Sequence, residues 1–142
     1  MRYLLVVLAA AGIVVSAFAL HAHYSTRYLE LPCDINSVWS CGLVNHSRYA
    51  VVLGVPVAMI GIIGYVLLGV VAWFRRRLPL MALSIIALGI SLRFTYIEAE
   101  VLHMWCLYCV MSQSIIAVMT ALAIGWWFTC RCRKPKATTP AA

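Results

Sequence analysis

Apolar residues run along this chain in four long stretches, and polar and charged residues gather in the short segments between them. The stretches cover about residues 3–20, 49–74, 78–97 and 106–129. Each is close to, or longer than, the roughly 20 apolar residues that a helix needs to cross a bilayer. Because little chain remains outside them, we expect one all-α membrane domain over residues 1–142, folded as a bundle of four transmembrane helices.

The first stretch has two possible fates. A charged start at Arg2 and the small-residue sequence Ala17-Phe18-Ala19 are typical of a cleaved signal peptide. Its apolar run of about 18 residues is longer than the usual 7–15 of such a peptide. We therefore expect a retained span, whereas cleavage would leave three spans and the same outer loop.

The longest polar segment, residues 21–48, is predicted to be a loop on the outer side of the membrane. A short amphipathic piece within it carries Ile35, Val38 and Trp39 at helical spacing. We expect this piece to be a short helix at the membrane surface, either a lid over the bundle or an ordinary interfacial anchor. Residues 134–142 are rich in Pro, Thr and Ala and are expected to be disordered.

The composition agrees with a membrane protein and explains the high net charge of +7. The chain is 65% hydrophobic and 11% charged, against about 45–50% and 25% in soluble domains. Most basic residues fall on one side of a four-span arrangement: Arg2, Arg75, Arg76, Arg77, Arg131, Arg133, Lys134 and Lys136. By the positive-inside rule both termini are cytoplasmic, so the charge indicates topology and gives no reason to expect a nucleic-acid partner.

This topology divides the cysteines between two compartments. Four of them, Cys33, Cys41, Cys106 and Cys109, fall on the outer side, where disulfides form and persist. The remaining two, Cys130 and Cys132, follow the last stretch on the side where thiols stay reduced. Such a division is what a transmembrane thiol oxidase needs.

Cys106 and Cys109 form a CxxC motif at the start of the last apolar stretch. Positions i and i+3 share a helix face, with Cα atoms roughly 5 Å apart, within the range that a disulfide accepts. The positive end of the helix dipole favours the thiolate, which is the nucleophile in disulfide exchange. The motif therefore predicts a redox pair, and an inert disulfide or two buried thiols is the alternative.

The loop cysteines are eight positions apart, which leaves their pairing open. A regular helix would separate Cys33 from Cys41 by about 12 Å, too far for a disulfide. They pair only if the segment folds back; otherwise each is free to meet a different partner. Their spacing does not match the paired knuckles of a structural zinc site, so we expect no metal.

Three features near the predicted site have more than one interpretation. Arg93, within the third stretch, either snorkels or pairs with Glu98 or Glu100, or it stabilises a thiolate or a reduced quinone. His103 is either a proton relay for Cys106 or an ordinary interfacial histidine. The second stretch contains four glycines, Gly54, Gly61, Gly64 and Gly69, which either allow close helix packing or leave room for a flat ligand. It also contains Pro56, which is expected to kink the helix.

Taken together, these motifs resemble the vitamin K epoxide reductase family. The resemblance rests on Cys33-Asp34, the seven-residue spacer to Cys41, Ser47 six residues later, and Cys106-Leu107-Tyr108-Cys109 at the last stretch. It covers about residues 3–130. The bacterial DsbB-like thiol oxidases carry the CxxC motif in the first outer loop, whereas here it comes after the loop cysteines, at the last stretch. The order of the two cysteine pairs along the chain is therefore reversed.

The resemblance implies a four-helix bundle that closes around a quinone (ubiquinone, menaquinone or vitamin K) beneath the outer loop. It also implies that Cys109 faces the quinone, that Cys106 exchanges disulfides with Cys41, and that Cys33 meets the thiol of a thioredoxin-fold protein. The chain would then be an oxidoreductase that supports disulfide bond formation. Four residues are candidates for the quinone pocket: Ser47, Asn45, Tyr65 and Gln113.

Two departures from the animal members of the family narrow the interpretation. Those members carry an Asn in the second span that recognises the quinone carbonyl, and here that span has none. They also carry a Tyr four residues after the second CxxC cysteine, where this chain has Gln113. We therefore expect a bacterial-type enzyme in the inner membrane, with its redox site facing the periplasm. Many bacterial members carry a fused thioredoxin-like domain, and because this sequence of 142 residues shows none, we expect the thioredoxin-fold partner to be a separate protein. Reduction of vitamin K or its epoxide by external thiols is the alternative activity, and a non-enzymatic disulfide-stapled scaffold is the alternative class.

Overall fold

The computed structural model describes residues 1–25, 33, 34, 36 and 38–131. Predictions that fall on Ile35, Cys132 and residues 134–142 lie outside this part of the chain, as does the side chain of Cys130. In chain order the elements are α1 (Arg2–Tyr24), α2 (Cys41–His46), the 3₁₀ turn η1 (Arg48–Ala50), β1 (Val51–Val52), β2 (Val55–Pro56), α3 (Val57–Trp73), α4 (Arg77–Ile97), the π-helical turn η2 (Glu98–Leu102) and α5 (Leu107–Arg131).

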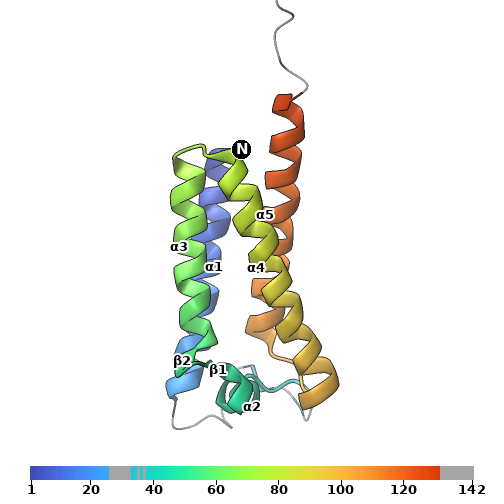
Figure 1. Ribbon diagram of the computed structural model, residues 1–142. Coiled ribbons are helices and arrows are strands. Elements are labelled where there is room, and N and C mark those ends of the chain that lie inside the picture. The colour runs from blue at the N-terminus through green and yellow to red at the C-terminus, as the bar shows by residue number, and fades with distance from the viewer. Residues whose placement is uncertain (26–32, 35, 37, 132–142) are drawn as a thin grey trace, which may run out of the picture.

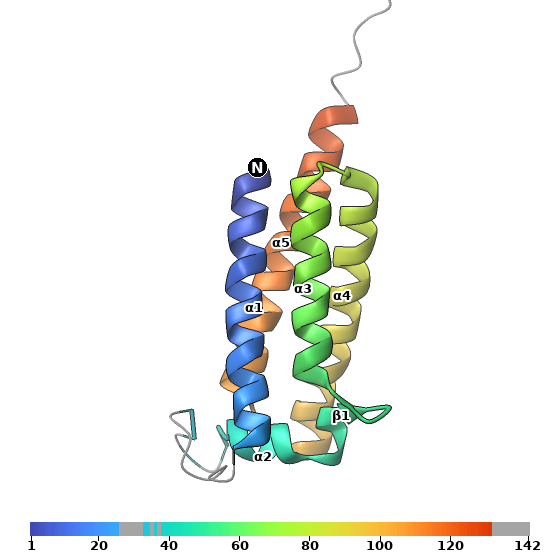
Figure 2. The same ribbon diagram turned by 90° about the vertical axis from the view of Figure 1, so that its left-hand side faces the viewer.

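The four long helices α1, α3, α4 and α5 run alongside one another as a bundle (Figures 1 and 2). The short helix α2 and the β1–β2 hairpin lie together at one end of the bundle. The N-terminus, the α3–α4 turn and the far end of α5 lie at the other end. The predicted all-α bundle is therefore present, and the elements described between α1 and α3 lie at a single end.

Three of these helices are long and apolar enough to cross a membrane, namely Arg2–Tyr24, Arg77–Leu102 and Leu107–Thr129. The protein is therefore an integral membrane protein. The fourth helix, α3, is apolar but has 17 residues, which is the lower limit of the range for a spanning helix. The structure thus confirms the apolar helical bundle but not the count of four spans.

The predicted start of the second span at residue 49 is wrong, because the chain forms a hairpin before α3 begins at Val57. In this hairpin Val52 pairs with Val55, and the two residues between them, Leu53 and Gly54, have φ values of 52° and 82°. Positive φ at both central positions is the geometry of the two-residue turn that matches strand twist. The predicted kink at Pro56 is wrong as well, because Pro56 ends β2 and directly precedes α3.

The third span continues beyond its predicted end at residue 97. The chain passes from α4 into the π-helical turn η2, and His103 ends the helix with a left-handed φ of 50°. This extension carries Glu98 into the bundle, where its side chain is buried. Single π-helical turns often occur at functional sites.

The core of the bundle lies between α1, α3, α4 and α5. It is formed by nine buried side chains: Leu5, Ala9, Tyr65, Leu68, Ala72, Leu80, Ile116, Met119 and Ala123. Glycines on α3 allow close packing against α1, since a Cβ at Gly61 would lie 3.1 Å from the Ser16 hydroxyl and one at Gly69 would lie 3.3 Å from the Ala9 Cβ. A Cβ at Gly64 would meet nothing within 4 Å. Two of the predicted glycines therefore pack helices, and Gly64 faces open space.

Arginine and tryptophan side chains meet at the end of the bundle that holds the N-terminus. The guanidinium group of Arg2 lies 5.5 Å from the ring centre of Trp73, and that of Arg77 lies 4.9 Å from Trp126. Such stacking is favourable between a cation and an aromatic face. At the opposite end, Arg93 stacks on Tyr96 at 5.7 Å.

Candidate active site

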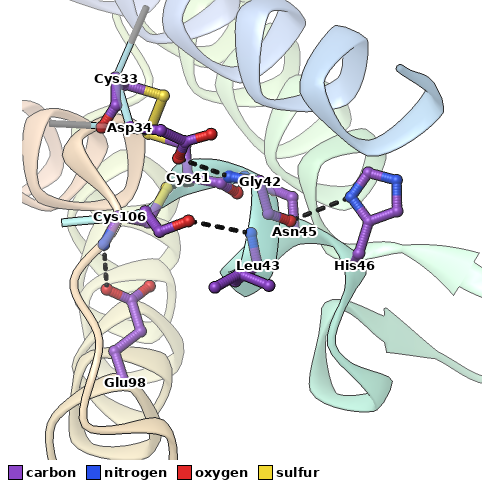
Figure 3. The surroundings of a disulfide bond; sticks show 10 residues. Cys33, Asp34, Cys41, Gly42, Leu43, Asn45, His46, Glu98 and Cys106 are labelled. Carbon is purple, nitrogen blue, oxygen red and sulfur yellow. Dashed lines mark hydrogen bonds between the residues drawn. A yellow bond between two sulfur atoms is a disulfide. The ribbon is translucent and has the colours of Figure 1, made fainter. Parts of the chain in front are cut away.

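The two loop cysteines, Cys33 and Cys41, form a disulfide with a Cα–Cα distance of 5.8 Å (Figure 3). The segment between them folds back, as pairing requires. Part of this reversal is local, because the Asn36 side chain accepts hydrogen bonds from the N–H groups of Val38 and Trp39 at 2.9 and 3.0 Å. Sequence spacing had left the pairing open, and the structure decides it.

The predicted short helix of the loop lies later in the chain than expected. Val38 and Trp39 are not helical; instead Val38 and Ser40 exchange backbone hydrogen bonds with Trp105 at 2.8 and 3.1 Å. The helix α2 begins only at Cys41, where the Ser40 hydroxyl accepts the N–H of Leu43 and caps the first turn. The position of the predicted helix is therefore wrong, and the backbone pairing with Trp105 holds this segment against the CxxC motif.

Cys106 directly precedes α5, and Cys109 lies in its first turn. Both are free thiols. The side chain of Cys106 has no exposed surface and packs with Cys33, Cys41 and Val44. The thiol that is nearer to the loop in sequence is therefore the one that lies beside the loop disulfide (Figure 3).

Asn45 on α2 links the two cysteine pairs. Its side-chain amide donates a hydrogen bond to the Cys41 carbonyl at 2.8 Å and another to the Cys106 sulfur at 3.6 Å. Its backbone carbonyl lies 2.5 Å from a ring nitrogen of His23 on α1. The contacts fix α2 against both the first helix and the CxxC motif.

The surroundings of Cys106 favour its thiolate. A hydrogen bond from the Cys109 thiol lowers the pKa of Cys106, and the backbone N–H groups of Cys109 and Tyr108 act in the same direction. Burial and the carboxylate of Glu98 oppose this shift without reversing it. The lowered pKa makes Cys106 a nucleophile suited to disulfide exchange.

A cavity of about 520 Å³ opens beneath α2, between the long helices. This volume is within the range of about 300–1,000 Å³ that small-molecule sites occupy. The cavity is lined mainly by apolar side chains of α3 and α4, and Cys109 belongs to its lining whereas Cys106 does not. The two thiols of one CxxC motif therefore have different neighbours: Cys106 meets the loop disulfide, and Cys109 meets the cavity.

The structure places three of the four candidate quinone-binding residues, Asn45, Ser47 and Tyr65, in the cavity lining. The Ser47 hydroxyl donates to the Val44 carbonyl at 2.8 Å. Tyr65 bonds through its hydroxyl to Ser112 on α5 at 2.9 Å. Gln113 is not part of the lining and is hydrogen-bonded to Ser91 on α4.

An apolar cavity with a few polar groups fits a quinone, whose flat ring and tail are apolar and whose carbonyls accept hydrogen bonds. The polar groups of the lining include the hydroxyls of Ser47, Tyr65 and Ser112 and the amide of Asn45. They are hydrogen-bonded within the protein, so donation to a quinone carbonyl would require them to exchange these partners. These residues would hold the group, which supplies an acceptor for two electrons and two protons.

Sequence reasoning missed two residues that shape this site. Glu98 was considered only as a partner for Arg93, but its carboxylate accepts the N–H of Cys106 at 3.2 Å and lines the cavity. Gly12 on α1 was not noted, although a Cβ there would overlap the Tyr65 ring. An acidic residue eight positions before a CxxC cysteine was the available signal for Glu98, whereas nothing in the sequence pointed to Gly12.

The bundle and its two cysteine pairs define a membrane protein with a buried dithiol site next to an apolar cavity. A sequence model of the vitamin K epoxide reductase family matches residues 3–124, so the chain belongs to this family. Its members are oxidoreductases linked to quinones, and they generally work with thioredoxin-like partners.

Proposed function

We propose that this protein is a thiol:disulfide oxidoreductase that transfers electrons from a separate thioredoxin-fold protein to a membrane quinone. Electrons enter at Cys33 and Cys41, pass to Cys106 and Cys109, and leave to the quinone, so that the cycle supports disulfide bond formation. The observation that carries the proposal is the division of the CxxC motif between the loop disulfide and the cavity.

Each step of the proposed relay has a chemical basis in the site. The loop cysteines lie close enough to form a disulfide, and Cys106 packs beside them, so a disulfide can pass between the two pairs by exchange. The lowered pKa of Cys106 supports exchange between this thiol and Cys41. Oxidation of the CxxC dithiol releases two electrons and two protons, which is what a quinone takes up.

We expect the purified protein, reconstituted with a dithiol such as DTT, to reduce ubiquinone or menaquinone faster than it reduces vitamin K epoxide. The chain lacks an Asn in α3, and this absence supports quinone over epoxide as the substrate. The measurement is the rate of dithiol oxidation with each acceptor in turn. Faster turnover of the epoxide would favour the alternative activity, and no acceptor-dependent oxidation at all would favour a disulfide-stapled scaffold.

We also propose a bacterial inner-membrane location, four spans, cytoplasmic termini and a redox site that faces the periplasm. Two exposed positions mark the two ends of the bundle: Leu53 in the hairpin turn (99% exposed) and Phe74 after α3 (69% exposed). We expect a membrane-impermeant maleimide to label Leu53→Cys, but not Phe74→Cys, in intact cells, with labelled peptides mapped by mass spectrometry. Neither substitution alters the arginines that set the topology, and labelling of Phe74→Cys alone would invert the orientation.

A further inference from the structure

Glu98 is a buried acidic side chain beside the CxxC motif, in contact with the backbone of Cys106 and the side chain of Cys109. Only 3% of its surface is exposed. One carboxylate oxygen accepts the Cys106 N–H at 3.2 Å (Figure 3). The single proton of the Cys109 thiol has two acceptors within reach, this carboxylate and the Cys106 sulfur. Because burial of a charge is costly unless its partners compensate, an acid at this position calls for an explanation beyond helix formation.

The carboxylate stands between a thiol and a ligand site. Glu98 and Cys109 both belong to the lining of the cavity, whereas the neighbouring acid Glu100, two residues later in the same π-helical turn, is exposed. Two histidines at this end of the bundle have other partners: His23 on α1 bonds to the Asn45 carbonyl, and His46 on α2 bonds to the Gly42 carbonyl. Within the part of the chain that the structure describes, the ionisable groups affected by the charge of Glu98 are the thiols of Cys106 and Cys109.

We propose that Glu98 takes the proton of the Cys109 thiol when this sulfur becomes a thiolate, and passes that proton into the cavity. The proposal deepens the proposed function, because it assigns a proton carrier to the same site. Glu98 would be a catalytic residue, since it touches a reacting sulfur.

The proton and electron balance is complete with this assignment. Oxidation of the Cys106–Cys109 dithiol to a disulfide releases two electrons and two protons, and the electron-accepting quinone takes up two of each. Glu98 carries the proton from Cys109. The proton of Cys106, whose pKa is lowered, is released to water earlier, during the disulfide exchange with the loop that leaves Cys106 as a thiolate, and the second proton for the quinone comes from water.

Replacement of Glu98 by glutamine separates proton transfer from simple positioning. The glutamine side-chain oxygen still accepts the Cys106 N–H, so the support of the CxxC backbone is preserved, but an amide does not take up a proton. Glu100→Gln is the matched control, because it removes the same charge two residues away at an exposed position.

The decisive measurement is the pH profile of Cys109 alkylation by iodoacetamide in quinone-free protein, with the modified peptide quantified by mass spectrometry. Cys106 is replaced by serine throughout, which leaves Glu98 as the ionisable partner of Cys109. A thiol and a carboxylate that share one proton form a fixed fraction of thiolate over a range of pH. With Glu98 present, or with Glu100→Gln, we expect a plateau in the alkylation rate over that range.

In Glu98→Gln we expect the plateau to be lost and the rate to fall about tenfold for each unit of decreasing pH, as for an isolated thiol. Glu98→Asp, which keeps a carboxylate on a shorter side chain, should retain a plateau at a lower rate. If Glu98 acted only by repelling the negative charge of the thiolate, Cys109 would be alkylated faster in Glu98→Gln at every pH, and the dependence of the alkylation rate on pH would keep the same slope. That result, or coinciding profiles of Glu98 and Glu98→Gln, would overturn the proposal.

A second measurement tests the same residue in the complete reaction. We expect Glu98→Gln, with all cysteines present, to reduce quinone about 10²-fold more slowly, which is the lower end of the usual contribution of general acid–base catalysis. The two experiments distinguish failure of the proton carrier from failure of the proposed function. A protein without quinone reduction but with a Glu98-dependent plateau would contradict the proposed function alone, and normal turnover in Glu98→Gln would contradict the proton carrier alone.

Discussion

Replacement of either CxxC cysteine is expected to reduce quinone reduction to the uncatalysed background. Without Cys106 or Cys109 the pair cannot form its internal disulfide, so no two-electron step is available next to the cavity. The measurement is the loss of quinone absorbance with DTT as the electron donor, for Cys106→Ala and Cys109→Ala separately. Because Cys106 is fully buried against the loop disulfide, folding of each variant must be checked by thermal unfolding.

The loop cysteines provide the matched comparison. We expect Cys33→Ala and Cys41→Ala to keep activity with DTT, which is small enough to reach the CxxC motif directly, and to lose activity with a thioredoxin-fold partner. Cys130→Ala with Cys132→Ala should remain active with both donors. Full activity of Cys33→Ala toward the protein partner would contradict the relay through the loop.

The bundle was predictable from the sequence because hydropathy is a strong signal over 20 residues, but it does not show where a helix begins. The stretch from residue 49 to 74 is apolar throughout, yet its first part forms the β1–β2 hairpin. The useful signal was local: Gly54 and Pro56 stand two residues apart, and both are common in turns. A conformational preference of individual residues therefore decides a boundary that hydropathy leaves open.

The cysteines Cys33, Cys41, Cys106 and Cys109 were singled out as candidates from their order in the sequence, but their contacts depend on distant parts of the chain. The reversal that brings Cys33 to Cys41 is supported by backbone pairing of Val38 and Ser40 with Trp105, more than sixty positions later in the sequence. No local pattern encodes such a pairing. The predicted surface helix was placed too early for the same reason. Val38 and Trp39 have helical spacing, but this segment pairs with Trp105 and does not form a helix.

The cavity residues show how one position on a helix changes a prediction. Gln113 was a candidate because of its place after the CxxC motif, but successive residues on a helix are turned by about 100°. Ser112 therefore faces Tyr65 and the cavity, whereas Gln113 faces Ser91 on α4. Glu98 was misjudged because the helix was expected to end before it, and the π-helical turn η2 instead carries it inward.

The order of electron flow can be tested by trapping the disulfides that link its steps. Exchange proceeds through a mixed disulfide, which accumulates when the resolving thiol is missing. In Cys109→Ser, the Cys106 thiolate attacks Cys41 in the loop disulfide and releases Cys33, and no second thiol resolves the product. We expect an internal Cys41–Cys106 bond with Cys33 as a free thiol. The serine hydroxyl can still donate a hydrogen bond to Cys106, so the stabilisation of its thiolate is partly kept.

The complementary variant traps the external partner. In Cys41→Ser, Cys33 lacks its resolving thiol, and we expect it to accumulate in a covalent complex with a thioredoxin-fold protein. Non-reducing gels followed by peptide mass mapping identify both bonds, and the mass of the trapped protein identifies the electron donor. The structure supports this order because Cys106 packs beside Cys41 and Cys33, whereas Cys109 lies one turn further along, at the cavity. A bond between Cys33 and Cys109 in Cys41→Ser would contradict the proposed route, since it would connect the external thiol to the quinone side without Cys106.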